Sequence, residues 1–396
     1  MKTSPLLSPD APPRTVTILG STGSVGRSTV DLISGHREKF KIRALTAHKN
    51  VGLLARQARD LHAEVAVIAD ESLYGDLKAA LEGTSVMAEA GQAAVVSAAG
   101  LPADWVMAAI VGAVGVEATL EAIRQGTTVA LANKESLVCA GSFMMEAVRK
   151  HGATLLPVDS EHNAVFQVLN AKQHTQIRRI VLTASGGPFL RRTREELRDV
   201  TPEQAMKHPT WSMGAKISVD SATMMNKALE IIEASYLFQL ESGKIDVLIH
   251  PQSVVHSMVE YIDGSVLSQM GAPDMRTPIA HTLAWPERMR TTGDTLDLSN
   301  SFSMSFEPVD PERFPVLKMA RQALQAGSGA PVVFNAANEV AVGAFLSRRL
   351  NFSEIERVVG EVLQIVPVQS MSGIQDVFRL DLDARRIAEK VVAGVD

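Results

Sequence analysis

The sequence has a single cysteine, Cys139, among its 396 residues. One cysteine forms no intramolecular disulfide, and it excludes zinc or iron–sulfur sites built from several thiolates. An excess of one charge is also lacking, because 39 lysines and arginines face 44 aspartates and glutamates, a net charge of −5. A chain with this balance has no overall attraction to nucleic acid or to an anionic membrane, so neither is expected as a partner.

Long apolar runs are absent too. The longest, residues 105–116, is too short to span a bilayer, and residues 1–14 contain no signal-peptide apolar stretch. The four prolines of residues 1–14 predict a flexible arm. We therefore expect a cytoplasmic protein without a membrane segment. The content of 46% hydrophobic and 21% charged residues is typical of a globular chain, and the length predicts two or three domains.

The N-terminal region alternates strand and helix patterns. Residues 16–19, 40–45 and 65–69 have the composition of buried strands, and helical patterns follow the first two. This alternation predicts an α/β fold with a parallel sheet covered by helices. The pattern continues through further strands at 105–111, 129–132 and 154–158.

The pattern changes after about residue 160. Strands are predicted at 177–183 and 247–249, and an antiparallel pair at 254–261 and 265–270 surrounds the turn Asp263-Gly264.

Residues 190–214 form a polar excursion between these strands, with capping boxes predicted at Thr193…Glu196 and Thr201…Gln204, and such an excursion is typical of a lid. Residues 291–312 have little periodicity and predict a linker, and helical patterns dominate from residue 315, with another capping box predicted at Ser353…Glu356.

A glycine-rich turn, Gly20-Ser21-Thr22-Gly23-Ser24-Val25-Gly26, follows the first strand. Glycines at such a turn let backbone N–H groups approach a pyrophosphate at a helix N-terminus, so the turn predicts a dinucleotide site. The alternative is a plain tight turn. The second strand is followed by His48-Lys49-Asn50, with no acidic residue for a ribose hydroxyl. Basic residues there favour NADP over NAD, unless His48 and Lys49 are ordinary solvated side chains.

Carboxylates mark a second site after the strand at 154–158. Continued strand geometry would point Asp159 and Glu161 the same way, as half of a site for a hard cation. The alternative is a solvated or helix-capping pair.

A third constellation lies at 218–230, where we expect a helix to begin near Ser221. Asn226, Lys227 and Glu230 would then share one helix face, with a phosphate at the helix start and Glu230 as a further metal carboxylate. The alternative is a surface pair of Lys227 with Glu230 beside a helix cap.

Several single residues have two interpretations. Trp211, which is costly to expose on a polar loop, is either part of a lid over substrate or a buried anchor of the loop. Lys134 follows a strand and faces the ligand crevice of a parallel sheet, and Ser185 follows another strand at a glycine turn. Cys139 is expected in the core. His250 and His281 are interpreted as structural, and His256 remains an active-site candidate.

Six segments together resemble the 1-deoxy-D-xylulose 5-phosphate reductoisomerase family. They are GSTGSVG, LANKESLV, PVDSEHNA, TASGGPF, HPTWSMGAKISVDSATMMNKALE and HPQSVVHSMVEY, in the family's order and spacing. The resemblance extends from about residue 16 to the C-terminus. It implies conversion of 1-deoxy-D-xylulose 5-phosphate to 2-C-methyl-D-erythritol 4-phosphate, with NADPH and Mg²⁺, Mn²⁺ or Co²⁺, in the non-mevalonate isoprenoid pathway. It also implies a homodimer and inhibition by fosmidomycin.

The flexible arm at 1–14 falls outside the resemblance. The resemblance implies a Rossmann-like NADPH domain at 15–159 and a central α+β catalytic domain at 160–290 with a flap at about 186–215. A linker at 291–312 and a C-terminal helical domain at 313–396 complete the implied organisation.

The resemblance also implies roles for individual residues. Metal carboxylates are implied at Asp159, Glu161 and Glu230, which with Lys134 and His208 are the implied catalytic residues. Substrate contacts are implied at Lys134, Ser160, Glu161, Ser185, His208, Trp211, Ser221, Asn226, Lys227 and Glu230. The NADPH site is implied at Thr22, Gly23, Ser24, Val25, His48, Lys49, Asn50, Asn133, Glu135 and Gly214. Family members often have glycine where this chain has His48.

Two other functions remain open from the residues themselves. One is an NADP-dependent metal dehydrogenase of another phosphorylated sugar or hydroxy acid, without rearrangement of the carbon skeleton. The other is a non-catalytic NADP-sensing protein. Turnover of the deoxyxylulose phosphate distinguishes the first, and cofactor binding without substrate-dependent oxidation would identify the second.

Overall fold

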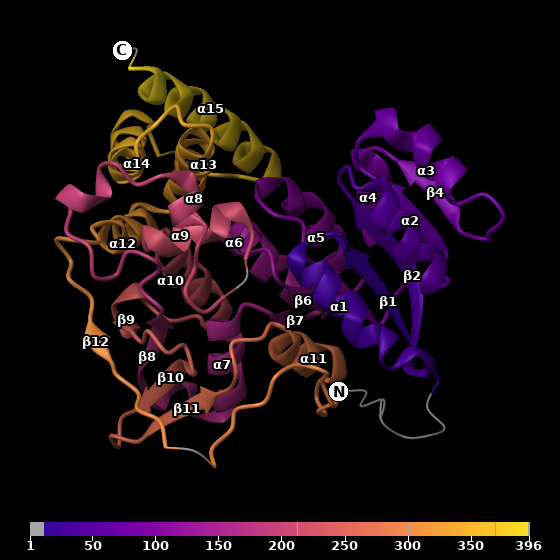
Figure 1. The fold of residues 1–396 in the computed structure, drawn as a ribbon, viewed down its shortest axis with the longest axis horizontal. Helices are drawn as coiled ribbons and strands as arrows, with labels where there is room; N and C mark the ends of the chain where they lie inside the picture. The colour runs from indigo at the N-terminus through magenta and orange to yellow at the C-terminus, as the bar shows by residue number, and fades with distance from the viewer. Residues whose placement is uncertain (1–11, 212, 300, 369, 395–396) are drawn as a thin grey trace. The chain divides into compact units, whose positions relative to one another are not determined.

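The structure, a computed structural model, describes residues 12–211, 213–299, 301–368 and 370–394. Most of the predicted arm, residues 1–11, lies outside the described residues, and Arg14 already belongs to the first strand. The chain forms two compact units, each assembled from separate segments (Figure 1). Unit 1 comprises the described residues of 1–136, 144–163 and 274–294, and unit 2 comprises those of 137–143, 164–273 and 295–396. The division into nucleotide, catalytic and C-terminal helical domains stays a prediction.

Unit 1 is built on a seven-stranded sheet in the order β4-β3-β2-β1-β5-β6-β7, with every neighbouring pair parallel. Its strands are β1 (Arg14–Leu19), β2 (Phe40–Ala47), β3 (Val65–Ile68), β4 (Met87–Ala90), β5 (Trp105–Ala108), β6 (Thr128–Leu131) and β7 (Thr154–Pro157). The predicted α/β parallel sheet is therefore confirmed. The strand order reverses direction at β1, which lies between β2 and β5, and in such sheets ligands bind at the carboxyl ends of the strands at this point.

Helices cover this sheet, because burying their apolar faces against it removes apolar surface from water. They are α1 (Ser24–Ser34), α2 (Val51–Asp60), α3 (Tyr74–Ala80), α4 (Gln92–Ala99), α5 (Val116–Arg124) and α6 (Lys134–His151), of which residues 137–143 belong to unit 2. The core includes the fully buried Ile18, Leu45 and Trp105. Burial of each such side chain contributes about 1.5–3 kcal/mol.

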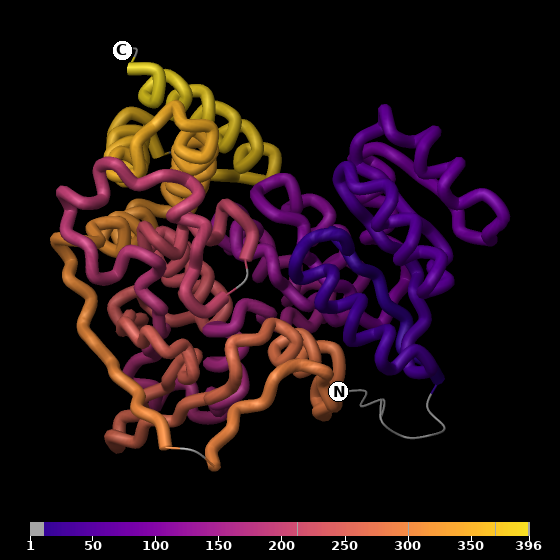
Figure 2. Tube along the Cα trace, in the orientation of Figure 1, coloured from indigo at the N-terminus to yellow at the C-terminus, as the bar shows by residue number. Residues whose placement is uncertain are grey.

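A late segment of the chain completes unit 1. Figure 2 shows the orange trace of α11 (Arg276–Ala284) returning to the indigo N-terminal elements, where α11 lies against α1. Two hydrogen bonds fix it: Trp105 Nε1 donates to the Thr282 carbonyl at 3.0 Å, and Arg14 Nη1 donates to the Leu283 carbonyl at 2.7 Å. The helical pattern of this segment was not part of the sequence-based prediction.

Unit 2 contains a mixed sheet in the order β11-β10-β8-β9-β12, in which only β8 and β9 are parallel. Its strands are β8 (Ile177–Ala184), β9 (Ile245–Ile249), β10 (Val255–Tyr261), β11 (Val266–Met270) and β12 (Glu307–Pro308). The predicted hairpin is confirmed, with Gly264 at a positive φ of 86° in its turn. The two-residue strand β12 lies inside the region that the sequence predicts as a linker.

Helices make up the rest of unit 2. They are α7 (Ser160–Val168, of which residues 164–168 belong to unit 2), α8 (Pro202–Ala205), α9 (Ala215–Ala222), α10 (Met225–Phe238), α12 (Val316–Ala326), α13 (Gly329–Leu346), α14 (Ile355–Ile365) and α15 (Ile374–Ala393). Figure 1 shows α13 between α14 and α15. By length and composition α13 is the one described helix that could cross a membrane, but 78% of its apolar window is buried. It is the central helix of the core that α12, α14 and α15 share.

Two local predictions for unit 2 were wrong. The helix expected to begin near Ser221 begins at Met225, and Ser221 lies in the last turn of the preceding helix, α9. Met224 separates the two helices with a positive φ of 62°. The capping box expected at Ser353…Glu356 is instead formed by Asn351 and Glu354. It caps the short 3-10 helix Phe352–Glu354, which precedes α14.

The two predicted capping boxes in the polar excursion are present. Thr201 and Gln204 cap α8 reciprocally, and Thr193 and Glu196 exchange the same pair of hydrogen bonds.

Candidate active site

The glycine-rich turn lies at the carboxyl end of β1, where the strand order reverses. Gly20 has a φ of 84°, and a Cβ there would come within 2.7 Å of the Ala109 carbonyl oxygen beyond β5. A Cβ on Gly26 would lie 2.2 Å from the Gly20 carbonyl oxygen. The turn closes only because both positions lack a side chain. Gly23 is the N-cap of α1 and provides no side-chain cap, so the first N–H groups of α1 are left to backbone or ligand acceptors.

The turn is held by polar contacts with distant elements. Ser21 Oγ donates to Gln57 Oε1 at 2.8 Å, Gln57 Nε2 donates to the Ser21 carbonyl at 3.0 Å, and the Gly20 N–H donates to Thr46 Oγ1 at 2.9 Å. These contacts join the turn to β2 and α2. Sequence reasoning missed Gln57 and Thr46, since the partners lie 26 or 36 residues apart and neither has a local motif.

The residues after β2 are exposed, as is required of a segment that contacts the 2′-phosphate of a cofactor. His48, Lys49 and Asn50 are all exposed, and Asn50 Oδ1 caps α2 by accepting from the Leu53 N–H at 3.1 Å. Lys49 lies 3.8 Å from Asp70, which follows β3. Sequence reasoning missed this carboxylate, because it sought an acid only at the end of β2. The segment keeps its exposed basic side chains, with one acid beside Lys49.

Polar side chains also follow β6. Asn133 is buried and caps α6 by accepting from the Ser136 N–H at 3.1 Å, while its Nδ2 donates to the Gly112 carbonyl at 3.0 Å. Lys134 and Glu135, in the first turn of α6, are also buried. Lys134 Nζ forms an ion pair with Asp159 Oδ2. The cation and the carboxylate that were predicted from different segments are thus brought together in unit 1.

Asp159 and Glu161 follow β7. One carboxylate oxygen of each lies within 4.8 Å of the other, so the two do face a common point. The reason given from sequence was wrong, because the strand ends at Pro157 and α7 begins at Ser160. Ser160, which is buried, donates through Oγ to Glu161 Oε2 at 2.5 Å. The close approach comes from the turn between strand and helix.

Asn163 fixes that turn. Its N–H donates to the Asp159 carbonyl at 2.8 Å, and its Nδ2 donates to the Pro157 carbonyl at 2.9 Å. The same amide group lies 3.2 Å from His281 Nδ1. Burial lowers the pKa of His281 to about 4, helped by the nearby Arg288, so the ring is neutral at pH 7 and Nδ1 accepts. The contact gives His281 the structural role that was expected.

Unit 2 brings Ser185 and His208 together. Ser185 Oγ lies 2.8 Å from His208 Nε2 and accepts from the Gly187 N–H at 3.1 Å. His208 Nδ1 accepts from the N–H groups of Thr210 and Trp211 at 3.3 and 3.0 Å. An accepting Nδ1 places the proton of the neutral ring on Nε2, which therefore donates to Ser185. Ser185 Oγ already accepts two hydrogen bonds and has its own O–H to donate.

Trp211 is half-buried, and its ring lies 6.0 Å from that of His256, centroid to centroid. This contact places the indole against β10, which agrees with both interpretations of Trp211. His256 is buried at the contact and stays an active-site candidate. His250 is structural, since Nε2 accepts from the N–H groups of Val254 and Val255 and Nδ1 lies 2.9 Å from the Ser305 carbonyl.

The third constellation lies where α9 meets α10. Asn226 Nδ2 donates to Glu230 Oε1 at 2.5 Å, and Lys227 Nζ donates to Glu230 Oε2 at 2.7 Å. Glu230 is fully buried and Lys227 is 3% exposed. The predicted common face is confirmed, and the surface-pair alternative is wrong because the pair is in the interior. Ser221 precedes this group at the end of α9, and Gly214 is the N-cap of α9.

Cys139 is free and buried, as expected for a core residue. Burial, together with this thiol, raises the pKa of Tyr236 in the same unit.

These features define a class of protein. A Rossmann-like parallel sheet with a glycine turn at its switch point, a basic segment after β2 and a carboxylate pair after β7 are the parts of a dinucleotide-dependent oxidoreductase of the α/β class.

Comparison with known proteins gives the particular family. Three family models match: 1-deoxy-D-xylulose 5-phosphate reductoisomerase at residues 16–141, the C-terminal domain of that enzyme at 155–238, and the DXP reductoisomerase C-terminal domain at 270–387.

The chain is 60% identical to the 1-deoxy-D-xylulose 5-phosphate reductoisomerase of Rhodospirillum centenum, over 96% of this chain and 95% of that protein. It is 56% identical to that of Zymomonas mobilis, over 94% and 96%. The chain belongs to the 1-deoxy-D-xylulose 5-phosphate reductoisomerase family.

Solved structures agree. The Zymomonas mobilis reductoisomerase in complex with NADPH matches with a TM-score of 0.91 and 54% identity, over 96% of this chain and 99% of that one. A reductoisomerase in complex with NADPH, fosmidomycin and magnesium matches with a TM-score of 0.91 and 40% identity, over 96% and 98%.

Proposed function

We propose that this chain catalyses the reaction of its family, the conversion of 1-deoxy-D-xylulose 5-phosphate to 2-C-methyl-D-erythritol 4-phosphate. The reaction uses NADPH and a divalent cation and belongs to the non-mevalonate isoprenoid pathway. The observation that carries the proposal is the 60% identity over 96% of the chain to a reductoisomerase. The substrate is rearranged through cleavage and re-formation of a carbon–carbon bond, and the resulting aldehyde is then reduced.

The carboxylates of Asp159, Glu161 and Glu230 are proposed to hold the cation, Mg²⁺, Mn²⁺ or Co²⁺. The donor chemistry fits, because the oxygens of Asp159 and Glu161 lie within 4.8 Å of each other and carboxylate oxygens suit hard divalent cations. Glu230 is a buried carboxylate in unit 2, which is costly unless it is paired with cations. When bound, the cation supplies Lewis-acid polarisation of substrate oxygens.

Substrate oxygens are proposed to contact Lys134 and Ser160. Lys134 is buried beside Asp159, so its ammonium group is held at the carboxylate pair and can donate to a substrate oxygen. The hydroxyl of Ser160, which donates to Glu161, would exchange a hydrogen bond with the substrate.

The substrate phosphate is proposed to bind Ser185, Ser221, Asn226 and Lys227. All four belong to unit 2, and Asn226 and Lys227 lie in the first turn of α10. The hydroxyl of Ser185 has its own proton to donate to an anion. Asn226 and Lys227 donate to Glu230, and phosphate binding would redirect part of that donation.

The segment at about 186–215 is proposed to be a flap that closes over the substrate. Trp211 lies on this segment with its ring against that of His256, and His208 joins the segment to Ser185. Closure would move the rings of His208 and Trp211 with the flap and exclude water from the reacting atoms.

NADPH is proposed to bind the glycine turn at Thr22, Gly23, Ser24 and Val25. His48, Lys49 and Asn50 would then face the 2′-phosphate, and Asn133, Glu135 and Gly214 the remainder of the cofactor. The exposed Lys49 supports NADPH over NADH. The cofactor supplies the hydride, and the chain supplies position and charge.

Assembly and location complete the proposal. A homodimer is supported by the edge strand β11, which exposes Val266 and Leu267 at 52% and 48% on an edge without a neighbouring strand in the described sheet. Sedimentation equilibrium tests it, with a monomer mass at micromolar concentration contradicting it. The protein is proposed to act in the cytoplasm, to bind fosmidomycin, and to bind neither nucleic acid nor membrane.

The decisive experiment follows NADPH absorbance with 1-deoxy-D-xylulose 5-phosphate, with and without Mg²⁺ or Mn²⁺. Metal-dependent loss of absorbance that fosmidomycin blocks is the expected result. Oxidation with a different phosphorylated sugar or hydroxy acid only would identify another NADP-dependent metal dehydrogenase. NADPH binding without oxidation of any of them would identify a sensing protein.

A further inference from the structure

A buried carboxylate that the proposed mechanism does not use lies one residue before Ser221. Asp220, in the last turn of α9, is 2% exposed. Its Oδ2 accepts from Lys216 Nζ at 2.8 Å, and its Oδ1 accepts from Asn338 Nδ2 at 2.9 Å. A carboxylate at this depth is tolerated only because both of its oxygens are satisfied.

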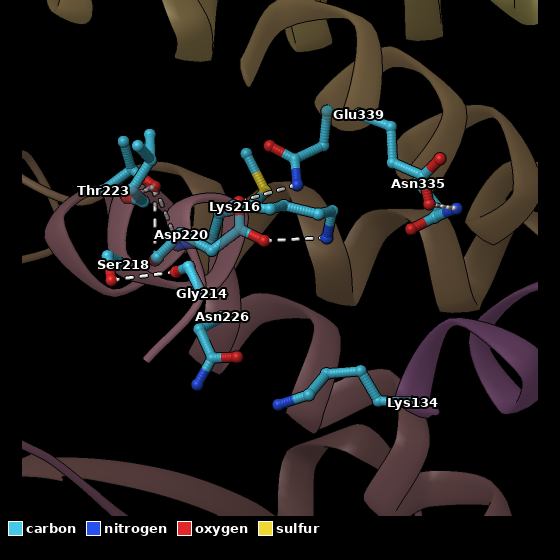
Figure 3. A network of polar contacts seen from close by, with 12 residues as sticks. Lys134, Gly214, Lys216, Ser218, Asp220, Thr223, Asn226, Asn335 and Glu339 are labelled. Carbon is cyan, nitrogen blue, oxygen red and sulfur yellow. Dashed lines mark hydrogen bonds and ion pairs between the residues drawn. The ribbon is translucent and has the colours of Figure 1, made fainter. Parts of the chain in front are cut away.

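The two contacts differ in what they connect. Lys216 and Asp220 are four residues apart on the same helix, so this pair can form in α9 without any other element. Asn338 lies on α13 and is fully buried. Figure 3 shows Lys216 and Asp220 directed toward the helix that carries Asn335 and Glu339. The Asn338 hydrogen bond is therefore a polar contact that ties the end of α9 to α13.

The end of α9 determines where the proposed phosphate ligands lie. Thr223 Oγ1 donates to the carbonyls of Val219 and Asp220 at 3.1 and 3.2 Å, and it accepts from the Met225 N–H at 3.3 Å. Met224 then turns the chain with a positive φ, and Asn226 and Lys227 follow at once. A shift of α9 would move Ser221 directly and the first turn of α10 with it.

The Ser185 turn rests on the same corner. A Cβ on Gly187 would lie 2.8 Å from Ala222 Cα and 3.0 Å from the Ser221 carbonyl oxygen, so the two backbones are in close contact there. All four proposed phosphate ligands therefore depend on the position of residues 220–224.

We propose that Asn338 and Asp220 are positioning residues for phosphate recognition. Asn338 on α13 holds the Asp220 carboxylate, and the carboxylate holds Ser221 and the start of α10 in place to bind the phosphate of the substrate. This inference rests on the proposed function. It gives the C-terminal helices a part in substrate affinity, although none of the proposed ligands comes from them.

The chain offers a matched control for Asn338. Asn335 is on the same helix, is equally buried, and donates through Nδ2 to Glu339 Oε1 at 3.1 Å and not to Asp220. Asn338→Ala and Asn335→Ala therefore each remove one buried amide from α13, with similar expected losses in thermal stability. Only the first removes the link to Asp220.

Asn338→Ala is expected to raise KM for 1-deoxy-D-xylulose 5-phosphate, and the inhibition constant of inorganic phosphate, about tenfold, the effect of losing a hydrogen bond to a charged group. The expected change in kcat is less than about threefold, and KM for NADPH is expected to stay constant, since the phosphate ligands alone are displaced. Asn335→Ala is expected to leave the substrate KM within about twofold of wild type.

Equal changes of substrate KM in both variants would show a merely structural role and overturn the proposal, as would an unchanged KM in Asn338→Ala. If either alanine variant does not fold, Asn338→Ser and Asn335→Ser provide the same comparison. A wild-type protein that does not turn over the substrate would refute the proposed function instead. The affinity for inorganic phosphate, measured by calorimetry in wild type and both variants, would still decide the positioning role.

Discussion

The two units solve the problem of anion binding differently. At the glycine turn of unit 1 the backbone forms the site, and the requirement is that Gly20 and Gly26 lack a Cβ. At the corner of α9 and α10 in unit 2 side chains form the proposed site, and Ser185, Asn226 and Lys227 are each held by another side chain. The glycines of the first site lie within seven consecutive residues, 20–26, although Thr46 and Gln57 also hold the turn. The second depends on residues as far apart as Asp220 and Asn338, which are 118 positions from each other.

The two sites are therefore expected to tolerate different kinds of substitution. A backbone site is sensitive to added atoms, because there is no space for them, and indifferent to most side chains nearby. A side-chain site is sensitive to removed groups, because each lost partner leaves a buried charge or donor unsatisfied. Four substitutions test this comparison.

The largest effect is expected for Glu230→Gln in unit 2. The change removes a proposed metal carboxylate and the partner of Lys227 and Asn226, and turnover should fall about a thousandfold or more. Steady-state NADPH oxidation at saturating Mg²⁺ measures it. Glu339→Gln, which removes a carboxylate paired with Arg385 in the same unit, is the control and should keep near-normal turnover. A near-normal rate for Glu230→Gln would refute the metal assignment.

Gly26→Ala tests the backbone site of unit 1. The new methyl group would lie 2.2 Å from the Gly20 carbonyl oxygen, so the turn must open, and KM for NADPH should rise about tenfold or more while the substrate KM changes little. Gly75→Ala in α3, where a Cβ meets no atom within 4 Å, is the matched control. Cofactor titration by fluorescence measures both. Equal cofactor affinity in the two variants would contradict the backbone account.

The pH dependence of stability is expected to report on His281 in unit 1. Its pKa of about 4 lies below the ordinary 6.5, so the unfolded chain binds the proton more readily. The neutral ring therefore stabilises fully above pH 6.5, and this stability is lost as the pH falls toward 4, by about 2–3 kcal/mol.

Chemical denaturation of wild type and His281→Gln from pH 7 to pH 4 measures this effect. The glutamine keeps an acceptor for Asn163 but does not titrate. The free energy of unfolding of the variant should therefore rise relative to that of the wild type as the pH falls. A stability difference that stays constant over this range would disprove the buried neutral histidine.

The smallest effect is expected for Lys49→Ala. The side chain is exposed and lies 3.8 Å from Asp70, so its attraction to a 2′-phosphate is screened by solvent. KM for NADPH should rise about fivefold at low salt and less at high salt, with KM for NADH unchanged. Asp70→Asn, which removes the competing acid, should lower KM for NADPH slightly. An equal rise in KM for NADPH and for NADH would refute the assignment of Lys49 to the 2′-phosphate site.

The comparison also explains which sequence-based predictions succeeded. Six of the seven strands of unit 1 and the tight glycine turn after the first of them follow from short-range patterns, and the structure confirms them, whereas β4 was not predicted. The cofactor role of the glycine turn stays a prediction. The helix start at Ser221 was wrong because its hydroxyl and acidic neighbours have the composition of an N-cap, whereas tertiary contacts make them the end of α9. The approach of Asp159 to Glu161 was predicted from strand alternation, yet it comes from a turn into α7 that Asn163 holds.

The sequence by itself determined the parallel sheet, the glycine turn, the hairpin at Gly264, the shared face of Asn226, Lys227 and Glu230, and the family. These depend on periodicity, on backbone freedom at glycine and on residues close in the chain. Only the tertiary structure decided that α11 completes unit 1, that Asp70 lies beside Lys49, and that Asn338 holds Asp220. Such contacts join segments whose separation carries no local signal, because they form only when buried polar groups must find partners in the folded core.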